Sequence, residues 1–150
     1  MIAPLRLGPR ADIALLLLRL MVGAAFVIHG LPKIQHPGNW LSATIPSVPG
    51  WLQALAAFAE FGGGIALIAG FLTPLFAFLI ACNMVVAIFF VLVPHGATFV
   101  SNAPGRQSYE LPAAYLVMAL AFILIGPGAY SVDGATGTSG NAARSGRRRR

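Results

Sequence analysis

The sequence predicts an all-α fold, a polytopic membrane four-helix bundle with both termini in the cytoplasm. Apolar residues make up 57% of the chain and charged residues only 9%, whereas soluble globular domains carry roughly 25% charged residues. The mean hydropathy is +0.79. Four apolar stretches, at about residues 12–31, 51–71, 75–93 and 109–126, each approach the length that crosses a bilayer.

The first stretch, residues 12–31, contains Arg19 and His29. At 1.5 Å per residue, about 20 residues cross a hydrocarbon core of roughly 30 Å. Arg6 and Arg10 precede it as in a signal peptide, but the stretch is longer than an ordinary apolar signal region and lacks a clear Ala-x-Ala cleavage site. We therefore expect an uncleaved helix.

The second and third stretches are separated by a tight turn. Before them, the segment 35–50 is rich in Pro, Gly, Ser and Asn and contains Trp40, which predicts a loop at the membrane–water interface. The second stretch covers 51–71. Thr73-Pro74 then predicts a reversal before the third stretch, 75–93.

The fourth stretch, 109–126, has the shortest uninterrupted apolar run and begins beside Glu110. After Asp133 the chain consists mainly of Gly, Ser, Thr, Ala and Arg, a composition that cannot bury a core. We therefore predict one membrane domain, residues 1–134, and a disordered basic cytoplasmic tail, residues 135–150.

The formal net charge of +6 is concentrated in that tail. Arg144 and Arg147–Arg150 supply five of the ten basic residues. A basic tail beside a membrane segment typically sets topology or contacts anionic lipid. We therefore expect anionic lipid at Arg147–Arg150 and no nucleic-acid partner.

The positions of the basic residues also predict the orientation. With four spans, Arg6, Arg10 and the five tail arginines lie on one side, and Lys33 and Arg106 lie on the other. Seven against two under the positive-inside rule puts both termini in the cytoplasm.

The sequence predicts no metal site and no covalently bound cofactor. Cys82 is the only cysteine, which excludes an intramolecular disulfide, a CxxC redox pair and a cysteine-based zinc site. His29, His36 and His95 do not form an HxxxH or HExxH spacing.

Arg19 and Glu60 are charged residues inside apolar stretches, where charge is costly and usually faces protein or water. Arg19 lies about eight residues into a helix that leaves the cytoplasm, and Glu60 about ten residues into one that returns, so their depths differ by about 5 Å. We expect them to pair or to share a polar cavity. Such a pair either only sets helix register or belongs to a functional site.

A second polar cluster is expected at the outer membrane surface. Positions 19, 26 and 33 are spaced by sevens and lie near one helix face, with His29 one turn before Lys33. Arg106 and Glu110 open the fourth stretch at that same surface. One interpretation is interface anchoring, with a carboxylate favoured at a helix N-terminus. The other is a quinone-headgroup, proton or anion site.

Small residues on the second stretch predict close helix packing. They are Gly62, Ala66 and Gly70. This small-xxx-small pattern lets another backbone approach, either within the chain or across a dimer. Asn83 on the third stretch needs a hydrogen-bond partner in lipid, and we expect it to act in packing.

These residues resemble those of the DoxX family of small bacterial membrane proteins over roughly residues 13–134. The first helix matches in Arg19, Gly23, Phe26 and His29-Gly30-x-x-Lys33. Further matches are Ala59-Glu60, Gly70, Tyr109-Glu110 and Gly126-Pro127-Gly128-x-x-Ser131-x-Asp133. The order of these motifs makes the resemblance fairly specific.

The resemblance implies a multi-pass four-helix bundle in the bacterial inner membrane. The family is named after a thiosulfate:quinone oxidoreductase subunit, which favours a quinone-handling or anchoring subunit of a membrane redox system. The alternatives are a proton- or cation-coupled transporter acting as a dimer, and a structural or assembly protein without catalysis. No catalytic residue is identified. At most, the chain is a non-catalytic or quinone-binding subunit of an oxidoreductase, with a redox partner subunit or a second copy as its partner.

Overall fold

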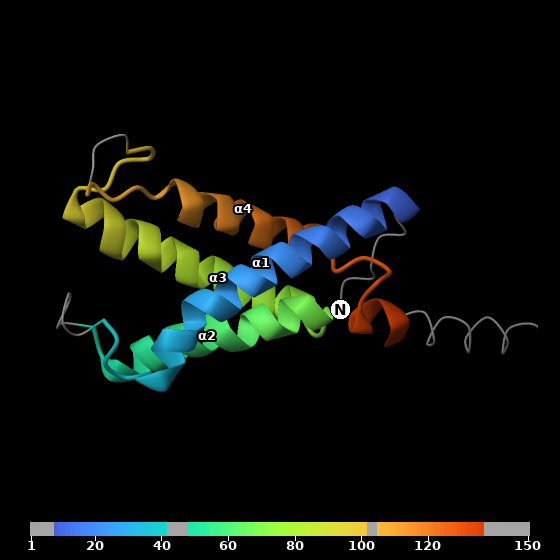
Figure 1. The fold of residues 1–150 in the computed structure, drawn as a ribbon, viewed down its shortest axis with the longest axis horizontal. Helices are drawn as coiled ribbons and strands as arrows, with labels where there is room; N and C mark the ends of the chain where they lie inside the picture. The colour runs from blue at the N-terminus through green and yellow to red at the C-terminus, as the bar shows by residue number, and fades with distance from the viewer. Residues whose placement is uncertain (1–7, 42–47, 102–104, 137–150) are drawn as a thin grey trace, which may run out of the picture.

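The computed structural model describes residues 8–41, 48–101 and 105–136 (Figure 1). Within these residues the chain is helical, with no β-strand beyond an isolated bridge between Thr98 and Ser108, so the predicted all-α class is confirmed. The elements are α1 (Pro9–Gln35), α2 (Gly50–Ala69), α3 (Thr73–Val86), the π-helix η1 (Ala87–Leu92), the 3₁₀ turn η2 (Val93–His95) and α4 (Glu110–Ile125).

α1 extends beyond the expected stretch 12–31 at both ends. It begins at Pro9, where a first-turn proline loses no helical hydrogen bond. It continues past Pro32 to Gln35, because a proline there removes one bond close to the end of the helix. α1 therefore carries Lys33 in its last turn.

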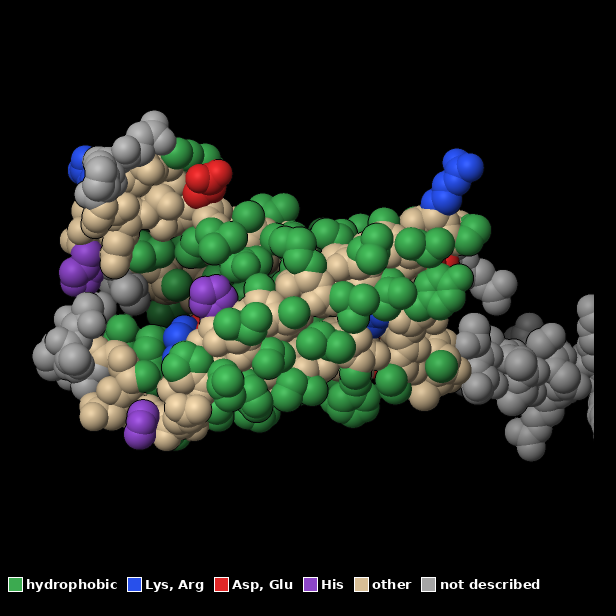
Figure 2. Space-filling model, viewed as in Figure 1, with side chains coloured by type: hydrophobic (Ala, Val, Ile, Leu, Met, Phe, Trp, Pro, Cys, Tyr) green, Lys and Arg blue, Asp and Glu red, His purple; other side chains and the backbone are tan. Residues whose placement is uncertain are grey.

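Within the described residues, three helical segments are long and apolar enough to cross a membrane. They are Pro9–Gln35, Gly50–Ala69 and the continuous segment Thr73–His95. α4 is a shorter apolar helix of 16 residues. Large hydrophobic side chains cover much of the outer surface of the helices (Figure 2), as expected where lipid replaces water as the solvent.

Successive helices run antiparallel, with α1 packed on α2, α2 on α3 and α3 on α4 (Figure 1). The core includes Val22, Ile80 and Phe122. Phe26 of α1 and Tyr115 of α4 join the two sides of the bundle, with their ring centroids 5.0 Å apart. At the end that carries the α1–α2 and α3–α4 connections, the α1/α2 pair diverges from the α3/α4 pair (Figure 1), and the surface is hollowed between them (Figure 2).

Both ends of the described chain lie at the opposite end of the bundle (Figure 1). There the N–H of Ala129 donates to Asp12 Oδ1 at 2.9 Å. A short helical segment at 132–136 takes in the first two residues of the expected tail. Arg6 and the rest of that tail, including Arg147–Arg150, lie outside the described residues.

The consecutive glycines of α2 face different neighbours. A Cβ on Gly64 would lie 2.7 Å from the carbonyl oxygen of Gly23, and a Cβ on Gly23 would lie 2.7 Å from the carbonyl oxygen of Gly64. Gly63, turned by about 100° on the helix, faces Ile80 of α3. Gly62 lies against Phe58 of its own helix. The glycine run therefore lets α2 pack closely on two helices at once.

The predicted packing stripe Gly62, Ala66 and Gly70 is not the line along which the backbones of α1 and α2 meet. Gly70 instead makes room for the Arg19 guanidinium, which a Cβ would overlap. The backbones of α1 and α2 meet where Gly64 faces Gly23. The spacing of small residues within α2 did not identify this contact. The register between the two helices decides which small residues are buried.

We expect Gly64→Ala to destabilise the protein by about 1–3 kcal/mol, because the new methyl group would meet the Gly23 backbone in an already filled contact. Gly62→Ala is the matched control, and it should be neutral or stabilising, since alanine is favoured over glycine in helices by about 1 kcal/mol. Thermal unfolding of both variants in detergent tests this. Equal midpoints would contradict the assigned packing.

Candidate functional site

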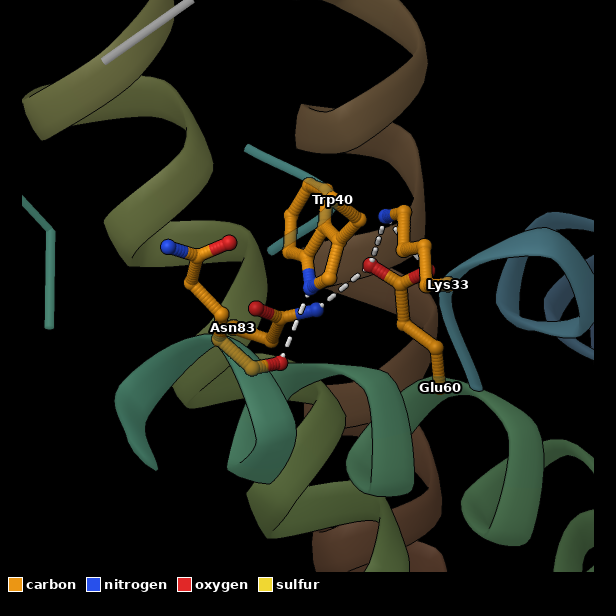
Figure 3. Close-up of polar contacts among 5 residues, drawn as sticks. Lys33, Trp40, Glu60 and Asn83 are labelled. Carbon is orange, nitrogen blue, oxygen red and sulfur yellow. Dashed lines mark hydrogen bonds and ion pairs between the residues drawn. The ribbon is translucent and has the colours of Figure 1, made fainter. Parts of the chain in front are cut away.

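Glu60 of α2 is the centre of a polar cluster built from three helices (Figure 3). Its side chain is only 5% exposed, and both carboxylate oxygens accept hydrogen bonds from Lys33 Nζ of α1 at 2.6 Å. Asn83 Nδ2 of α3 donates to Oε1 at 2.7 Å. The buried carboxylate is therefore paired with a cation and an amide, as a buried charge requires.

Trp40, in the connection after α1, covers Lys33. Nζ lies 4.4 Å from the centroid of the indole ring, within the range of a cation–π contact. The indole N–H donates to the carbonyl oxygen of Gln53 at 2.9 Å. The buried Gln53 side chain accepts from the N–H of Leu41 at 2.8 Å and donates to the carbonyl oxygen of Val48 at 3.0 Å. Gln53 therefore ties the connection, and Trp40 with it, to α2.

Three members of this cluster were not assigned to a site from the sequence. Trp40 was expected only as an interface residue, Asn83 only as a packing amide, and Gln53 was not singled out. Their common signal is a polar or aromatic group beside apolar stretches, which many structural residues share. A further signal is visible only in the structure, where the π-helix η1 begins one turn after Asn83, since such irregular turns are frequent at functional sites.

Arg19 belongs to a separate polar cluster at the other end of the bundle. Its side chain is fully buried, and Nη2 donates to the carbonyl oxygen of Tyr130. Asp133 attracts it electrostatically. The Asp133 carboxylate also accepts from the backbone N–H groups of Leu72 at 2.9 Å and Thr73 at 2.8 Å. It thereby caps α3, where an anion is favoured, and this cluster joins α1 and α3 to the segment after α4.

The predicted pairing of Arg19 with Glu60 is not found. A Cβ on Gly30 would contact Phe61, so Glu60 lies level with Gly30, whereas Arg19 lies level with Gly70. Arg19 and Gly30 are separated by about 16 Å along α1 at 1.5 Å per residue. The prediction assumed that the first apolar stretch ends at the same membrane depth at which the second begins. Instead, α1 continues to Gln35 and brings Lys33 to the carboxylate.

The predicted outer cluster is also rearranged. Lys33 turns to Glu60 rather than to Glu110, and the side chains of His29, Arg106 and Glu110 are exposed. Glu110 lies in the first turn of α4, where the helix dipole favours a carboxylate. In the part of the chain that the structure describes, no three His, Cys, Asp or Glu side chains are close enough to hold a metal ion.

Charge exchange distinguishes the observed pair from the predicted one. Either Lys33→Glu or Glu60→Lys alone should cost about 3–5 kcal/mol, because it leaves a buried charge without its partner. The two together should recover most of that loss, whereas Arg19→Glu combined with Glu60→Arg should recover none. Thermal unfolding and the monodisperse yield in detergent measure both cycles. Recovery of stability in the Arg19→Glu, Glu60→Arg variant would contradict the pairing of Lys33 with Glu60.

Comparison with known proteins identifies the family. The model of the DoxX family matches residues 14–93. The inner membrane protein YqjF of Escherichia coli (strain K12) is 29% identical over 123 residues, which cover 81% of this chain and 91% of the relative. No solved structure matches the chain significantly. Because the family model covers more than half of the sequence, with Arg19, Lys33 and Glu60 inside the match, the chain belongs to the DoxX family, as the sequence resemblance predicted.

Proposed function

We propose that this chain is a multi-pass inner-membrane subunit of a redox system, and that it binds a quinone headgroup at Lys33, Glu60, Asn83 and Trp40. The observation that carries the proposal is the Lys33 ammonium, which a buried carboxylate holds through both oxygens beneath an indole ring. Family membership and the curated inner-membrane relative support the location.

The chemistry of the cluster suits a quinone carbonyl. An ammonium group has three N–H donors, and Glu60 uses two of them. The Lys33 side chain is 24% exposed, and we assign its third donor to the acceptor oxygen of the quinone. Hydrogen bonds from a charged donor contribute about 1.5–3 kcal/mol. The Trp40 indole adds a flat aromatic surface beside that donor, against which a planar ring packs well.

The arrangement of the helices supports access from the membrane. The cluster lies at the end where the α1/α2 and α3/α4 pairs diverge, and the outer surfaces of both pairs are apolar (Figures 1 and 2). A quinone with a hydrocarbon tail dissolves in the bilayer core and can enter such a site laterally from the membrane, between the two helix pairs. The only cysteine is Cys82, so the proposal assigns electron transfer to a partner subunit rather than to this chain.

We also propose an orientation for the chain in the membrane. Asp12 and Ala129 meet at one end of the bundle, so both ends of the described chain lie on the same side. Lys33 and Arg106 belong to the opposite end, and the excess of arginines near the termini favours the cytoplasm for the terminal side. The Lys33–Glu60 cluster then lies toward the outer side of the membrane.

Reporter fusions test the orientation. Alkaline phosphatase fused after Gly38, in the α1–α2 connection, should be active, and the same enzyme fused to the C-terminus should be inactive. Green fluorescent protein at the C-terminus is the matched control, and it should fluoresce. An active phosphatase at the C-terminus would reverse the orientation.

Trp40 provides a direct test of quinone binding, because the chain has only two tryptophans, Trp40 and Trp51. In Trp51→Phe, a short-chain ubiquinone analogue should quench the fluorescence of Trp40 saturably. Adding Lys33→Met should weaken binding by roughly tenfold or more, since a charged hydrogen bond is lost. Arg106→Met, which removes an exposed cation, should leave binding unchanged.

The Trp40→Phe variant reports quenching by quinone that only dissolves in the detergent. In Trp40→Phe the remaining fluorophore is Trp51, and in Trp51→Phe it is Trp40. If the quinone quenched both fluorophores equally and without saturation, the proposed site would be ruled out.

A further inference from the structure

We infer that Glu60, Asn83 and Trp40 form a binding site for a small organic ammonium ion, and that the Lys33 side chain occupies this site in the structure as a tethered cation. The inference does not depend on quinone binding. It follows from what surrounds Lys33 Nζ, namely two carboxylate oxygens at 2.6 Å and an indole ring at 4.4 Å. A carboxylate and an aromatic face are the groups that recognise organic ammonium ions.

The receptor groups are held in place independently of Lys33. Asn83 donates to Glu60 Oε1 at 2.7 Å, and both residues lie within their helices rather than at the helix ends. Trp40 is held by its bond to the carbonyl oxygen of Gln53, a residue that is only 1% exposed. Groups that are positioned before a ligand arrives lose little freedom on binding it. The site therefore keeps its shape when the ammonium of Lys33 leaves.

Lys33 is the movable member of the pair. Its side chain is 24% exposed against 5% for Glu60, and it lies in the last turn of α1, close to the end of the helix. A lysine at such a position can extend its four-carbon stem and place its ammonium in the interface. Glu60 cannot follow, and a buried carboxylate without a cation is costly. An incoming ammonium ion removes that cost, so exchange of one cation for another keeps the site neutral.

Lys33 is also the only lysine of the chain, which makes the exchange directly measurable in the unmodified protein. Benzyltrimethylammonium is a suitable probe, because it has a permanent charge and cannot donate a proton. By displacing the Lys33 ammonium from Glu60, this probe should accelerate the acetylation of Lys33 by an amine-reactive reagent. Peptide mass spectrometry measures the rate of acetylation. The N-terminal α-amino group of the purified protein, on a different peptide, is the internal control and should react at an unchanged rate.

The same variants give opposite responses to the two ligands. Lys33→Met in the Trp51→Phe background should bind benzyltrimethylammonium at least roughly tenfold more tightly, because the tethered competitor is gone, whereas it should bind quinone more weakly. Adding Glu60→Gln should abolish ammonium binding. Arg106→Met, the matched control, should not change it. Trp40 fluorescence reads all four titrations.

The outcomes separate this inference from the proposed function. Unchanged Lys33 acetylation in the unmodified protein, or ammonium binding that survives Glu60→Gln, overturns the inference and leaves quinone binding untouched. A quinone that fails to quench Trp40, together with faster Lys33 acetylation in the presence of the ammonium probe, overturns the proposed function and supports the cation site. Because the acetylation test needs no substitution, a variant that fails to fold does not block it.

Discussion

The contact between Gly23 and Gly64 sets the register of α1 against α2, and both polar clusters depend on it. With these two backbones touching, Lys33 reaches Glu60 at one end and Arg19 lies against Gly70 at the other. A shift by one turn, about 5.4 Å, would separate Lys33 from Glu60 and move Arg19 away from the space that Gly70 leaves for its guanidinium. In an apolar solvent such a shift is strongly opposed, because it would part the opposite charges of Lys33 and Glu60.

The two clusters stabilise different parts of the molecule. At the terminal end, Arg19 and Asp133 tie α1, the start of α3 and the segment after α4 together. At the other end, the Lys33–Glu60 pair joins α1 and α2, and Asn83 links them to α3. At this end the α1/α2 pair diverges from the α3/α4 pair (Figure 1), which leaves the Glu60 cluster next to the opening.

The Glu60 cluster combines features that packing alone does not need. A structural ion pair requires one cation and one carboxylate, but here an indole covers the cation and a buried Gln53 holds that indole in place. A partly exposed ammonium on a rigid, buried carboxylate supplies both a hydrogen-bond donor and a replaceable charge. These two properties underlie the quinone and organic-ammonium proposals. They are also the reason why removing the Lys33 charge should weaken quinone binding and strengthen ammonium binding.

The sequence by itself determined the solvent, the helical class and the approximate helix positions, because apolar length and residue composition are local properties. It also identified Arg19 and Glu60 as charges that need compensation, since a charge in an apolar stretch is visible without a partner, whereas Lys33 was expected only in a cluster at the outer membrane surface. Only the tertiary structure decided that Lys33, and not Arg19, pairs with Glu60, and that Gly64 rather than Gly62 meets α1. Partner choice depends on helix register and on where α1 ends, and both are set by contacts between residues far apart in the chain.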